Sequence, residues 1–400
     1  MKAGAKDIVY LVGTSTTTRG GIGYVIGAHL NSDLKRQFRL IHIITHQDGG
    51  PLLKAATYAG CLLKFLLLRL TLGGKLVHLH SSNGPSFLRK CLFFFLSKGT
   101  GCRVVFQIHS GGFLDYYEAS GRVMRFVIRY VLRASDHVVV LTASWKERME
   151  KLLGDAANIS VIGNPIDTSR YHPFPKDNDP SRNVRLLFLG ALIRPKGVYD
   201  IVDCMRRLKG QGLRPRVTLA GDRELDQVRR YSIESGVEEL IELPGWVSEQ
   251  TKLELLKASD LLLLPSYKEG LPLCVLEAMA CGLPVICTGV GGLGDLVAHG
   301  ENGFIMVPGD SEAMAAHITK LVQDSSLREQ MGSRNARAVQ NSYSLLVIAQ
   351  QVASLYWRTL ERAEGGCHDE GVPTGNATGS GTPPRQVRQS ASAQLEYPAR

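Results

Sequence analysis

The sequence predicts an α/β protein made of two Rossmann-like, doubly wound domains that face a cleft. Three observations lead to this fold class. First, 400 residues exceed what one hydrophobic core usually organises. Second, short β-branched and apolar runs alternate with longer helical patterns, which is typical of parallel sheets covered by helices on both faces. Third, the series of runs breaks at a Pro- and Asp-rich stretch, residues 165–183, and then begins again.

The short apolar runs give the expected strands, and ligands are expected at their carboxyl ends. Each half opens with a run that leads into glycine, at Val12-Gly13 and at Leu189-Gly190. The expected strands are residues 7–12, 41–45, 76–80, 104–109, 137–141 and 159–162 in the first half, and 185–189, 216–220, 240–243, 261–264, 284–287 and 304–307 in the second.

The domain boundaries follow from these runs. We expect an N-terminal domain over residues 1–165, a linker over 166–183 and a C-terminal domain over 184–340. A helix over 341–362 is expected to pack back toward the N-terminal domain. Gly, Ser, Thr, Pro and Gln then dominate and large apolar residues are few, so residues 363–400 are expected to form a disordered tail.

Charge is concentrated in the first half. The chain has a formal net charge of +10, and residues 1–165 hold 21 Lys and Arg against 9 Asp and Glu. Nucleic acid and an anionic membrane surface both attract such a field, so charge alone does not choose between them. Part of this positive charge forms one stripe on an expected helix, made of Arg122, Arg125, Arg129 and Arg133. The apolar residues expected to pack on the domain from the opposite side are Val123, Phe126, Val127, Tyr130 and Val131. A solvated helix face and a docking surface for an anionic leaflet both remain open.

The sequence gives an expectation for the compartment. No segment has the charged, apolar and small-residue regions of a signal peptide. The most apolar stretch, residues 62–72, is interrupted by Lys64 and Arg69, so we expect it to be too short to cross a bilayer and to form a buried or interfacial helix. The eight cysteines show no CxxC pair, which favours reduced thiols. We expect a cytoplasmic protein, with peripheral attachment to the inner face of the membrane as the alternative.

The segment over residues 265–286 carries the most chemical information. An apolar strand ends at Pro265, a loop with Glu269 follows, and a helix leads to Gly282. Glu269 therefore lies at the carboxyl end of a strand, and Glu277 lies in the helix, where it can point toward the same cleft. Loop amides and a helix N-terminus supply donors to an anionic ligand, and two carboxylates can accept hydrogen bonds from vicinal hydroxyls. The alternative makes both glutamates solvated surface charges.

The spacing of these two glutamates, with seven residues between them, resembles that of the retaining glycosyltransferases of family 4. Members of that family adopt the two-domain GT-B architecture. The resemblance spans about residues 5–360 and rests on further motifs that occur in order. They are Thr18-Arg-Gly-Gly-Ile-Gly23, Ile108-His-Ser-Gly-Gly-Phe-Leu-Asp-Tyr-Tyr117, Phe188-Leu-Gly-Ala-Leu-Ile-Arg-Pro-Lys-Gly197, Ala220-Gly-Asp222, Gly245-Trp-Val247, Gly289-Val-Gly-Gly-Leu-Gly-Asp-Leu-Val297 and Asn302-Gly-Phe-Ile305.

The resemblance implies roles for residues of the C-terminal half. Glu269 would contact the donor sugar, and Glu277 would hold the ribose hydroxyls. Lys196 would meet the donor pyrophosphate. Where the family commonly has an arginine this chain has Ala191, which leaves Arg194 as the expected second cation. The loop amides expected beside the sugar are those of Gly270, Leu271 and Leu273. The alternative is that the two cations merely solvate a turn.

In the N-terminal half, the resemblance makes His109 the residue beside the transferred sugar, at the rim of the cleft. The expected catalytic residues are therefore His109, Glu269 and Lys196. A lone histidine is more often a satisfied core residue, which is the alternative. Gly20 and Gly21 would allow the backbone to approach a donor phosphate closely, although a plain turn explains them equally well.

The resemblance implies a retaining hexosyltransferase of polysaccharide or glycolipid biosynthesis. Its N-terminal domain would bind a glycan or lipid-linked acceptor, and its C-terminal domain a UDP- or GDP-sugar. Lys196, Arg194 and the loop amides can stabilise the leaving phosphate, so no metal and no cofactor is demanded. Two other functions stay open. A sugar-nucleotide epimerase of the same fold would act without an acceptor. A non-enzymatic module would bind membrane or nucleic acid, although the basic half lacks the interleaved aromatic residues of a nucleic-acid platform.

Overall fold

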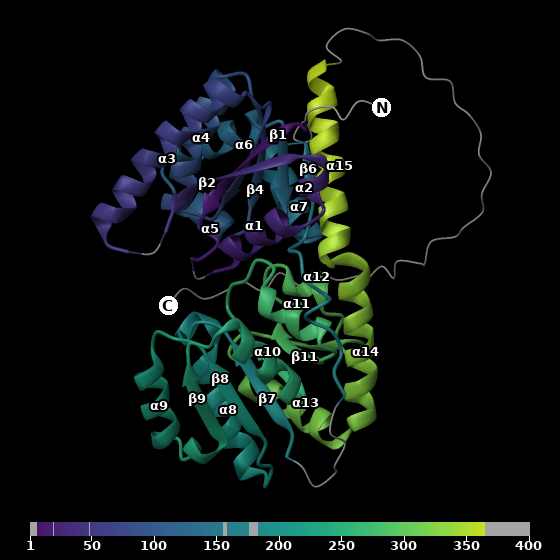
Figure 1. The fold of residues 1–400 in the computed structure, drawn as a ribbon. Coiled ribbons are helices and arrows are strands. Elements are labelled where there is room, and N and C mark those ends of the chain that lie inside the picture. Colours follow the sequence, from purple (N-terminus) through teal and green to yellow (C-terminus); the bar gives the residue numbers. More distant parts are fainter. Residues whose placement is uncertain (1–5, 19, 48, 155–157, 176–182, 365–400) are drawn as a thin grey trace, which may run out of the picture. The chain divides into compact units, whose positions relative to one another are not determined.

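The computed structural model describes residues 6–18, 20–47, 49–154, 158–175 and 183–364. These residues form two six-stranded parallel sheets with helices packed on them (Figure 1). This confirms the α/β fold with two doubly wound sheets. Residues 176–182 of the expected linker and residues 365–400 of the expected tail lie outside the described part, and the domain boundaries stay predictions.

The first sheet has the strand order β2-β1-β3-β4-β5-β6, and its order reverses between β1 and β3. Parallel strands with both faces covered should be buried along their length, and all six residues of β3 are buried, among them His78, His80 and Ser81. The strands are β1 (Ile8–Thr14), β2 (Arg39–His46), β3 (Leu76–Ser81), β4 (Arg103–Ile108), β5 (His137–Val140) and β6 (Ile159–Val161).

The second sheet repeats this pattern with the order β12-β11-β10-β7-β8-β9, which reverses between β7 and β10. Ligands of doubly wound sheets bind beyond the carboxyl ends of the strands at such a reversal. The strands are β7 (Arg185–Leu189), β8 (Arg216–Ala220), β9 (Ile241–Gly245), β10 (Leu261–Leu264), β11 (Val285–Thr288) and β12 (Gly303–Met306).

Helices connect these parallel strands. In the first half they are α1 (Gly21–Asn31), α2 (Leu34–Gln37), α3 (Pro51–Leu72), α4 (Pro85–Gly99), α5 (Phe113–Ala119), α6 (Arg122–Ala134) and α7 (Ala143–Leu153). In the second half they are α8 (Val198–Gly210), α9 (Leu225–Glu234), α10 (Glu249–Ala258), α11 (Leu273–Ala280), α12 (Leu293–Leu296), α13 (Ser311–Gln323), α14 (Ser325–Ser342) and α15 (Leu345–Glu364). Two 3₁₀ turns cover Arg194–Lys196 and Glu238–Leu240.

Helix α15 completes the core of the first half. Alternate side chains of a strand point to opposite faces of its sheet, so β1 contributes to two different clusters. Tyr10 lies in the cluster with Phe65 of α3, whereas Val9 packs with Ile348 and Tyr356 of α15. The buried Tyr356 hydroxyl also lies 2.7 Å from Nδ1 of His78 on β3.

Helix α3 is longer than the sequence indicated. It begins at Pro51, so the expectation of a short segment confined to residues 62–72 is wrong. Among the described residues it is the one helix that is long and apolar enough to cross a membrane, by length and composition alone. Only 11% of its most apolar 18 residues is buried, so it is not the buried helix that was one alternative. Lys64 is exposed on its surface and does not interrupt the helix.

The orientation of α6 also differs from the expectation. Val123, Phe126 and Tyr130 were expected to pack on the domain, but 78%, 68% and 49% of their surfaces are exposed. The expectation holds for Val131, which is buried, and for Val127, which is partly buried against the core. Ile128 and Leu132 also pack inward. The arginines and three large apolar residues therefore share the outward side of the helix.

Candidate active site

The loops that follow β4 and β10 touch each other through their backbones. A Cβ atom on Gly111 would lie 2.1 Å from the carbonyl oxygen of Glu269, and one on Gly270 would lie 2.7 Å from that of His109. Only glycine permits such approaches. The Gly292 amide donates to the Gly270 oxygen at 2.8 Å, and Nδ2 of Asn164 donates to the Leu271 oxygen at 2.7 Å. The motifs around His109 and Glu269, which are distant in sequence, are therefore neighbours.

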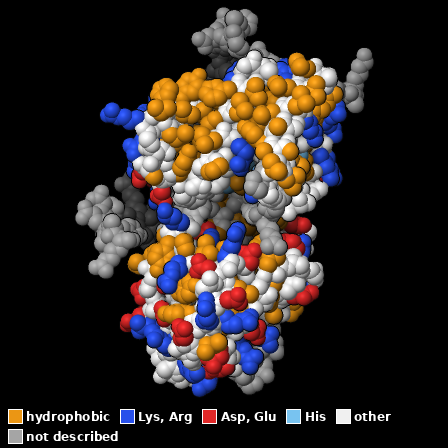
Figure 2. All heavy atoms as spheres, turned by 90° about the vertical axis from the view of Figure 1, so that its left-hand side faces the viewer, with side chains coloured by type: hydrophobic (Ala, Val, Ile, Leu, Met, Phe, Trp, Pro, Cys, Tyr) orange, Lys and Arg blue, Asp and Glu red, His pale blue; other side chains and the backbone are white. Residues whose placement is uncertain are grey.

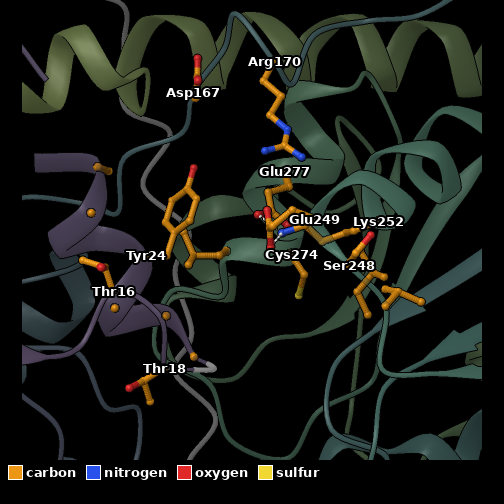
Figure 3. Close-up of a pocket in the computed structure, with 18 of the residues that line it drawn as sticks. Thr16, Thr18, Tyr24, Asp167, Arg170, Ser248, Glu249, Lys252, Cys274 and Glu277 are labelled. Atoms are coloured by element: carbon orange, nitrogen blue, oxygen red, sulfur yellow. Dashed lines mark hydrogen bonds and ion pairs between the residues drawn. The ribbon is translucent and has the colours of Figure 1, made fainter. Parts of the chain in front are cut away.

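A cavity of about 870 Å³ lies beside these loops and is lined by both halves of the chain (Figure 3). The N-terminal half contributes the turn after β1 and the start of α1, including Gly20, Gly21 and Tyr24. The C-terminal half contributes the ends of β7 and β8, the start of α10, and α11 with Glu277. Its size suits a nucleotide-sized ligand, since ligand pockets commonly measure about 300–1,000 Å³.

Glu277 is the most deeply buried carboxylate of this cavity. Only 2% of its surface is exposed. Burial raises the pKa of its carboxyl group, and this is opposed by the ammonium group of Lys252, which lies 2.7 Å from Oε1. Lys252 also lies 3.0 Å from Oε1 of Glu249, and the two carboxylates outweigh its own desolvation and raise the lysine pKa. We therefore treat the Glu277–Lys252 pair as ionised and the lysine as permanently charged.

Glu269 has a cationic partner of its own. Nζ of Lys196 lies 2.6 Å from Oε1 of Glu269, which is 8% exposed. The 3₁₀ turn that carries Lys196 ends at Gly197, where φ is 71° and a Cβ atom would lie 2.2 Å from the Pro265 oxygen. The glycine thus lets the turn after β7 pack against the end of β10, and this contact brings the lysine to the glutamate.

His109 is half-buried and adjoins a row of three buried histidines, His80, His78 and His29. Its Nε2 lies 3.0 Å from Nδ1 of His80, whose ring centroid lies 4.1 Å from that of His78. The ring of His29 is the next neighbour, 5.9 Å from that of His80. Burial lowers the pKa of His109 to about 3 and that of His29 to about 4. These rings are therefore neutral at pH 7 and can exchange hydrogen bonds without a net charge.

The structure divides the expected site residues into two groups. Gly20, Gly21, Leu273 and Glu277 line the cavity. Within the described residues, the lining does not include His109, Lys196, Glu269, Gly270 and Leu271, which form the adjoining cluster of loops. It also omits Arg194, whose guanidinium carbon lies over the Tyr199 ring, 4.6 Å from its centroid. The catalytic and donor-binding roles of all these residues stay predictions.

Several residues of the cavity could not be recognised from isolated motifs. Figure 3 shows Arg170 pointing toward Glu277, with Lys252 and Glu249 beside it. Tyr24 lies on α1, across the cavity from these residues. Burial and, to a smaller extent, the nearby Glu277 carboxylate raise the pKa of its hydroxyl group to about 12. Lys252 follows the Gly245-Trp-Val247 motif by one helical turn, after Ser248 caps the start of α10. A motif that continued from Gly245-Trp-Val247 into α10 would have included Lys252.

Metal ligands can be considered only for the described residues. Among these, no group of three or more His, Cys, Asp or Glu is arranged to hold a metal ion. The sequence contains an Asp-x-Asp pattern, which often holds a metal in sugar-nucleotide sites, at Asp177-Asn-Asp179. This pattern lies outside the described residues, as does Arg19 of the glycine-rich motif.

Comparison with known proteins identifies the family. The family described as Glycosyltransferase Family 4 matches residues 23–170, and that described as Glycosyl transferases group 1 matches residues 173–338. The chain belongs to glycosyltransferase family 4. Glycogen synthase of Mycobacterium tuberculosis is 28% identical to this glycosyltransferase over 244 residues, which are 60% of the chain and 58% of the relative. The chain thus matches little more than half of the length of that curated relative.

Solved structures support the architecture of this glycosyltransferase. Sucrose-phosphate synthase from Thermosynechococcus elongatus superposes with a TM-score of 0.76 at 20% identity, over 90% of this chain and 100% of the other. HepE from Anabaena, solved in complex with UDP, gives a TM-score of 0.70 at 19% identity, over 88% and 100%. At such identities the likeness shows the fold alone, and that fold is the expected GT-B architecture.

Proposed function

We propose that the chain is a retaining glycosyltransferase. It transfers a hexose from a nucleotide diphosphate sugar to a hydroxyl group of a glycan or lipid-linked acceptor, without a metal ion. The observation that carries this proposal is the cavity lined by both halves, with the buried Glu277 on its wall and the Lys196–Glu269 pair next to it. The family membership of the chain supports the same reaction class.

The charges fit the parts of such a donor. A ribose offers two vicinal hydroxyls, and the fixed, ionised Glu277 is a suitable acceptor for both. A diphosphate needs cations and amides, which the Gly20–Gly21 turn and Lys196 would supply. On donor binding Lys196 would exchange Glu269 for the diphosphate, which would leave the Glu269 carboxylate to accept hydrogen bonds from the sugar.

Retention of configuration would follow from attack on the face that the leaving group vacates. The acceptor oxygen forms a bond to the anomeric carbon while the bond from that carbon to the phosphate oxygen breaks. The acceptor proton passes to an oxygen of the departing diphosphate, so no protein nucleophile is required. The protein stabilises the negative charge that develops on the diphosphate, and this is the interaction that lowers the barrier.

The donor base and the sugar are tested by thermal unfolding. HepE was solved with UDP, which makes UDP-sugars the first candidates, with GDP-sugars as the second set. A nucleotide sugar that binds only the folded chain raises the melting temperature. No shift with either set would contradict the donor assignment. The donor that binds is then incubated with and without a glycan acceptor, and the anomeric configuration of the product is read by NMR.

The same incubation separates the transferase from an epimerase of similar fold. A transferase consumes the donor at a useful rate only with acceptor and yields a product with the donor's anomeric configuration. An epimer of the donor formed without any acceptor would favour the epimerase, and an inverted product would remove the retaining mechanism.

A further inference from the structure

The outward sides of α3, α4 and α6 form one exposed apolar face, which we call the α3–α4–α6 surface. Figure 2 shows hydrophobic side chains gathered on the N-terminal half, whereas the C-terminal half carries mixed acidic and basic side chains on the same view. The exposed apolar residues of the surface are Leu52, Leu53, Leu63, Leu67, Leu70 and Leu72 of α3, Leu88, Leu92 and Phe95 of α4, and Val123, Phe126 and Tyr130 of α6.

Aromatic contacts join two of these helices on the outside of the molecule. The ring of Tyr130 stacks on Phe126 of its own helix and on Phe95 of α4, with centroid distances of 6.2 Å in both cases. Phe95 is 48% exposed and Phe126 68% exposed. A continuous patch of this kind exceeds the scattered apolar residues that a protein surface normally carries, and it indicates that something covers it.

The charges on this surface are of one sign. The sequences of α3, α4 and α6 contain no Asp and no Glu. Their basic residues that are exposed are Lys54 and Lys64 of α3 and Arg122, Arg125, Arg129 and Arg133 of α6. A covering partner must therefore be apolar in its interior and negatively charged at its boundary.

The way in which α3 is attached to the first sheet indicates whether this helix spans a bilayer or lies on its surface. One side of α3 is fixed to the first sheet, because Phe65 is fully buried and the Tyr10 hydroxyl donates to the carbonyl oxygens of Leu68 and Gly73 at 3.1 and 2.7 Å. Nη2 of Arg69 donates to the Thr100 oxygen at 2.7 Å. A helix held along one side in this way exposes only its other side, which is the arrangement of a helix in the plane of the membrane interface.

We propose that the α3–α4–α6 surface docks the N-terminal half onto an anionic lipid bilayer. The exposed leucines and aromatic rings enter the boundary between headgroups and acyl chains, while the surrounding lysines and arginines contact lipid phosphates. A second copy of the chain fits less well, because a twofold contact would place the same basic residues against one another. Nucleic acid would match the charge but not the leucines. Docking does not depend on the proposed reaction, and its test requires no activity.

The test is sedimentation of the full chain with two kinds of vesicle. One kind is pure phosphatidylcholine, and the other contains equal parts of phosphatidylcholine and phosphatidylglycerol. The apolar variant is Leu63→Gln/Leu70→Gln, at residues that are 61% and 80% exposed. Its matched control is Ile233→Gln/Val307→Gln in the C-terminal half, at residues that are 56% and 55% exposed.

The basic variant is Arg122→Ser/Arg129→Ser/Arg133→Ser. Arg125 is kept, because its guanidinium donates to the carbonyl oxygens of Tyr117 and Glu118 and thus holds α5. The matched control changes Arg206, Arg229 and Arg337, exposed arginines of the C-terminal half, to Ser. Circular dichroism melting checks that each variant is folded, and the same samples are examined for oligomers in solution.

We expect the unaltered chain to bind anionic vesicles at low salt and to be released as salt rises. The basic variant should bind about a hundredfold more weakly, and the apolar variant about tenfold or more, whereas both controls bind like the unaltered chain. Three results would overturn the proposal: no binding to anionic vesicles, equal binding to both kinds, or unchanged binding of the apolar variant. A dimer that dissociates in the apolar variant would show that a second copy covers the surface instead.

Discussion

Lys196 and Glu269, which are 73 residues apart in sequence, form a direct ion pair with 2.6 Å between Nζ and Oε1. The two residues were expected to contact different parts of one ligand. In the structure each neutralises the other, so the buried carboxylate is compensated before any donor arrives. This relationship makes the stability of the loop cluster depend on the lysine.

Replacing Lys196 with alanine should therefore destabilise the fold as well as the proposed reaction. The change leaves Glu269 buried without its cation, and we expect a loss of roughly 1–3 kcal/mol in the free energy of unfolding. The loss stays below that of a fully buried pair because 28% of the lysine side chain is exposed. Urea unfolding measures it. Adding Glu269→Gln should restore most of the stability, and a Lys196→Ala chain as stable as the original would contradict the argument.

Substitution of Glu277 should mainly change the affinity for the nucleotide diphosphate, whereas substitution of Glu269 should mainly change turnover. Glu277→Ala is expected to weaken nucleotide diphosphate binding about tenfold or more in calorimetry, because it removes the acceptor for the ribose hydroxyls. Lys252 keeps Glu249 as a partner at 3.0 Å, so the variant should still fold. Glu269→Ala should mainly lower turnover. Glu254→Ala, at an exposed position of α10, is the control. Equal loss of diphosphate affinity in both site variants would refute the division of roles.

Gly111 and Gly112 form a matched pair for testing the contact between the two loops. In Gly111→Ala the new methyl group would lie 2.1 Å from the Glu269 oxygen, so the loops must separate. In Gly112→Ala the nearest atom, Nδ2 of Asn83, would be 3.4 Å away, which is tolerable. We expect Gly111→Ala to lower turnover about a hundredfold, since small displacements of reacting groups have effects of that size. Comparable activities of the two variants would show that the contact is not needed.

The buried histidines predict a loss of stability in acid. The pKa of His29 is lowered to about 4 in the folded chain by burial, whereas an unfolded chain binds this proton near pH 6.5. The unfolded state thus binds more protons between these values, and stability falls as the pH falls through this range. The contribution of His29 should be roughly 2 kcal/mol between pH 8 and pH 5.

Denaturant unfolding at both pH values measures this effect. The difference between pH 8 and pH 5 should shrink in His29→Leu and stay unchanged in His172→Gln, whose side chain is exposed. Comparing differences between pH values removes the packing change that leucine introduces. An unaltered pH dependence in His29→Leu would contradict the assignment.

Transfer should persist when divalent metals are removed. The proposed site relies on lysine and backbone amides for the leaving diphosphate, so EDTA should leave the rate of product formation within about twofold. Product formation in the presence of the chelator is the measurement. Complete loss of activity in EDTA, with recovery on adding magnesium or manganese, would require a metal in the mechanism.

Central strands such as β7 and β10 could be predicted from the sequence because they are buried and almost entirely apolar. The run at residues 261–264 coincides with β10, and that at 185–189 with β7. The order of strands within each sheet could not be read in the same way, since all the runs look alike. The exposure of the outward leucines of α3 could not be predicted, for a related reason. Apolar composition normally signals burial, and here the exposed side of the helix is apolar as well.

A site residue could be predicted only where one motif contains both the functional side chain and the backbone segment that positions it. Glu277 was expected in the cavity because its own helix directs it there. Its partner Lys252 lies 25 residues earlier on another helix, and only the packing of α10 beside α11 brings them together. Likewise, nothing in the sequence around His109 indicates that Nδ1 of His80 lies within hydrogen-bonding distance of its Nε2.

The packing of α15 has a consequence for synthesis of the chain. Val9 and Leu11 of β1 leave the ribosome long before Ile348, Val352 and Tyr356, which complete their cluster. The first sheet therefore keeps an uncovered apolar face until the second sheet and α15 have also been translated. Domains usually fold in the order of their synthesis, but here the earlier sheet depends on a helix that follows the later one, so a premature stop codon within α15 would disable the half of the protein that had already been made.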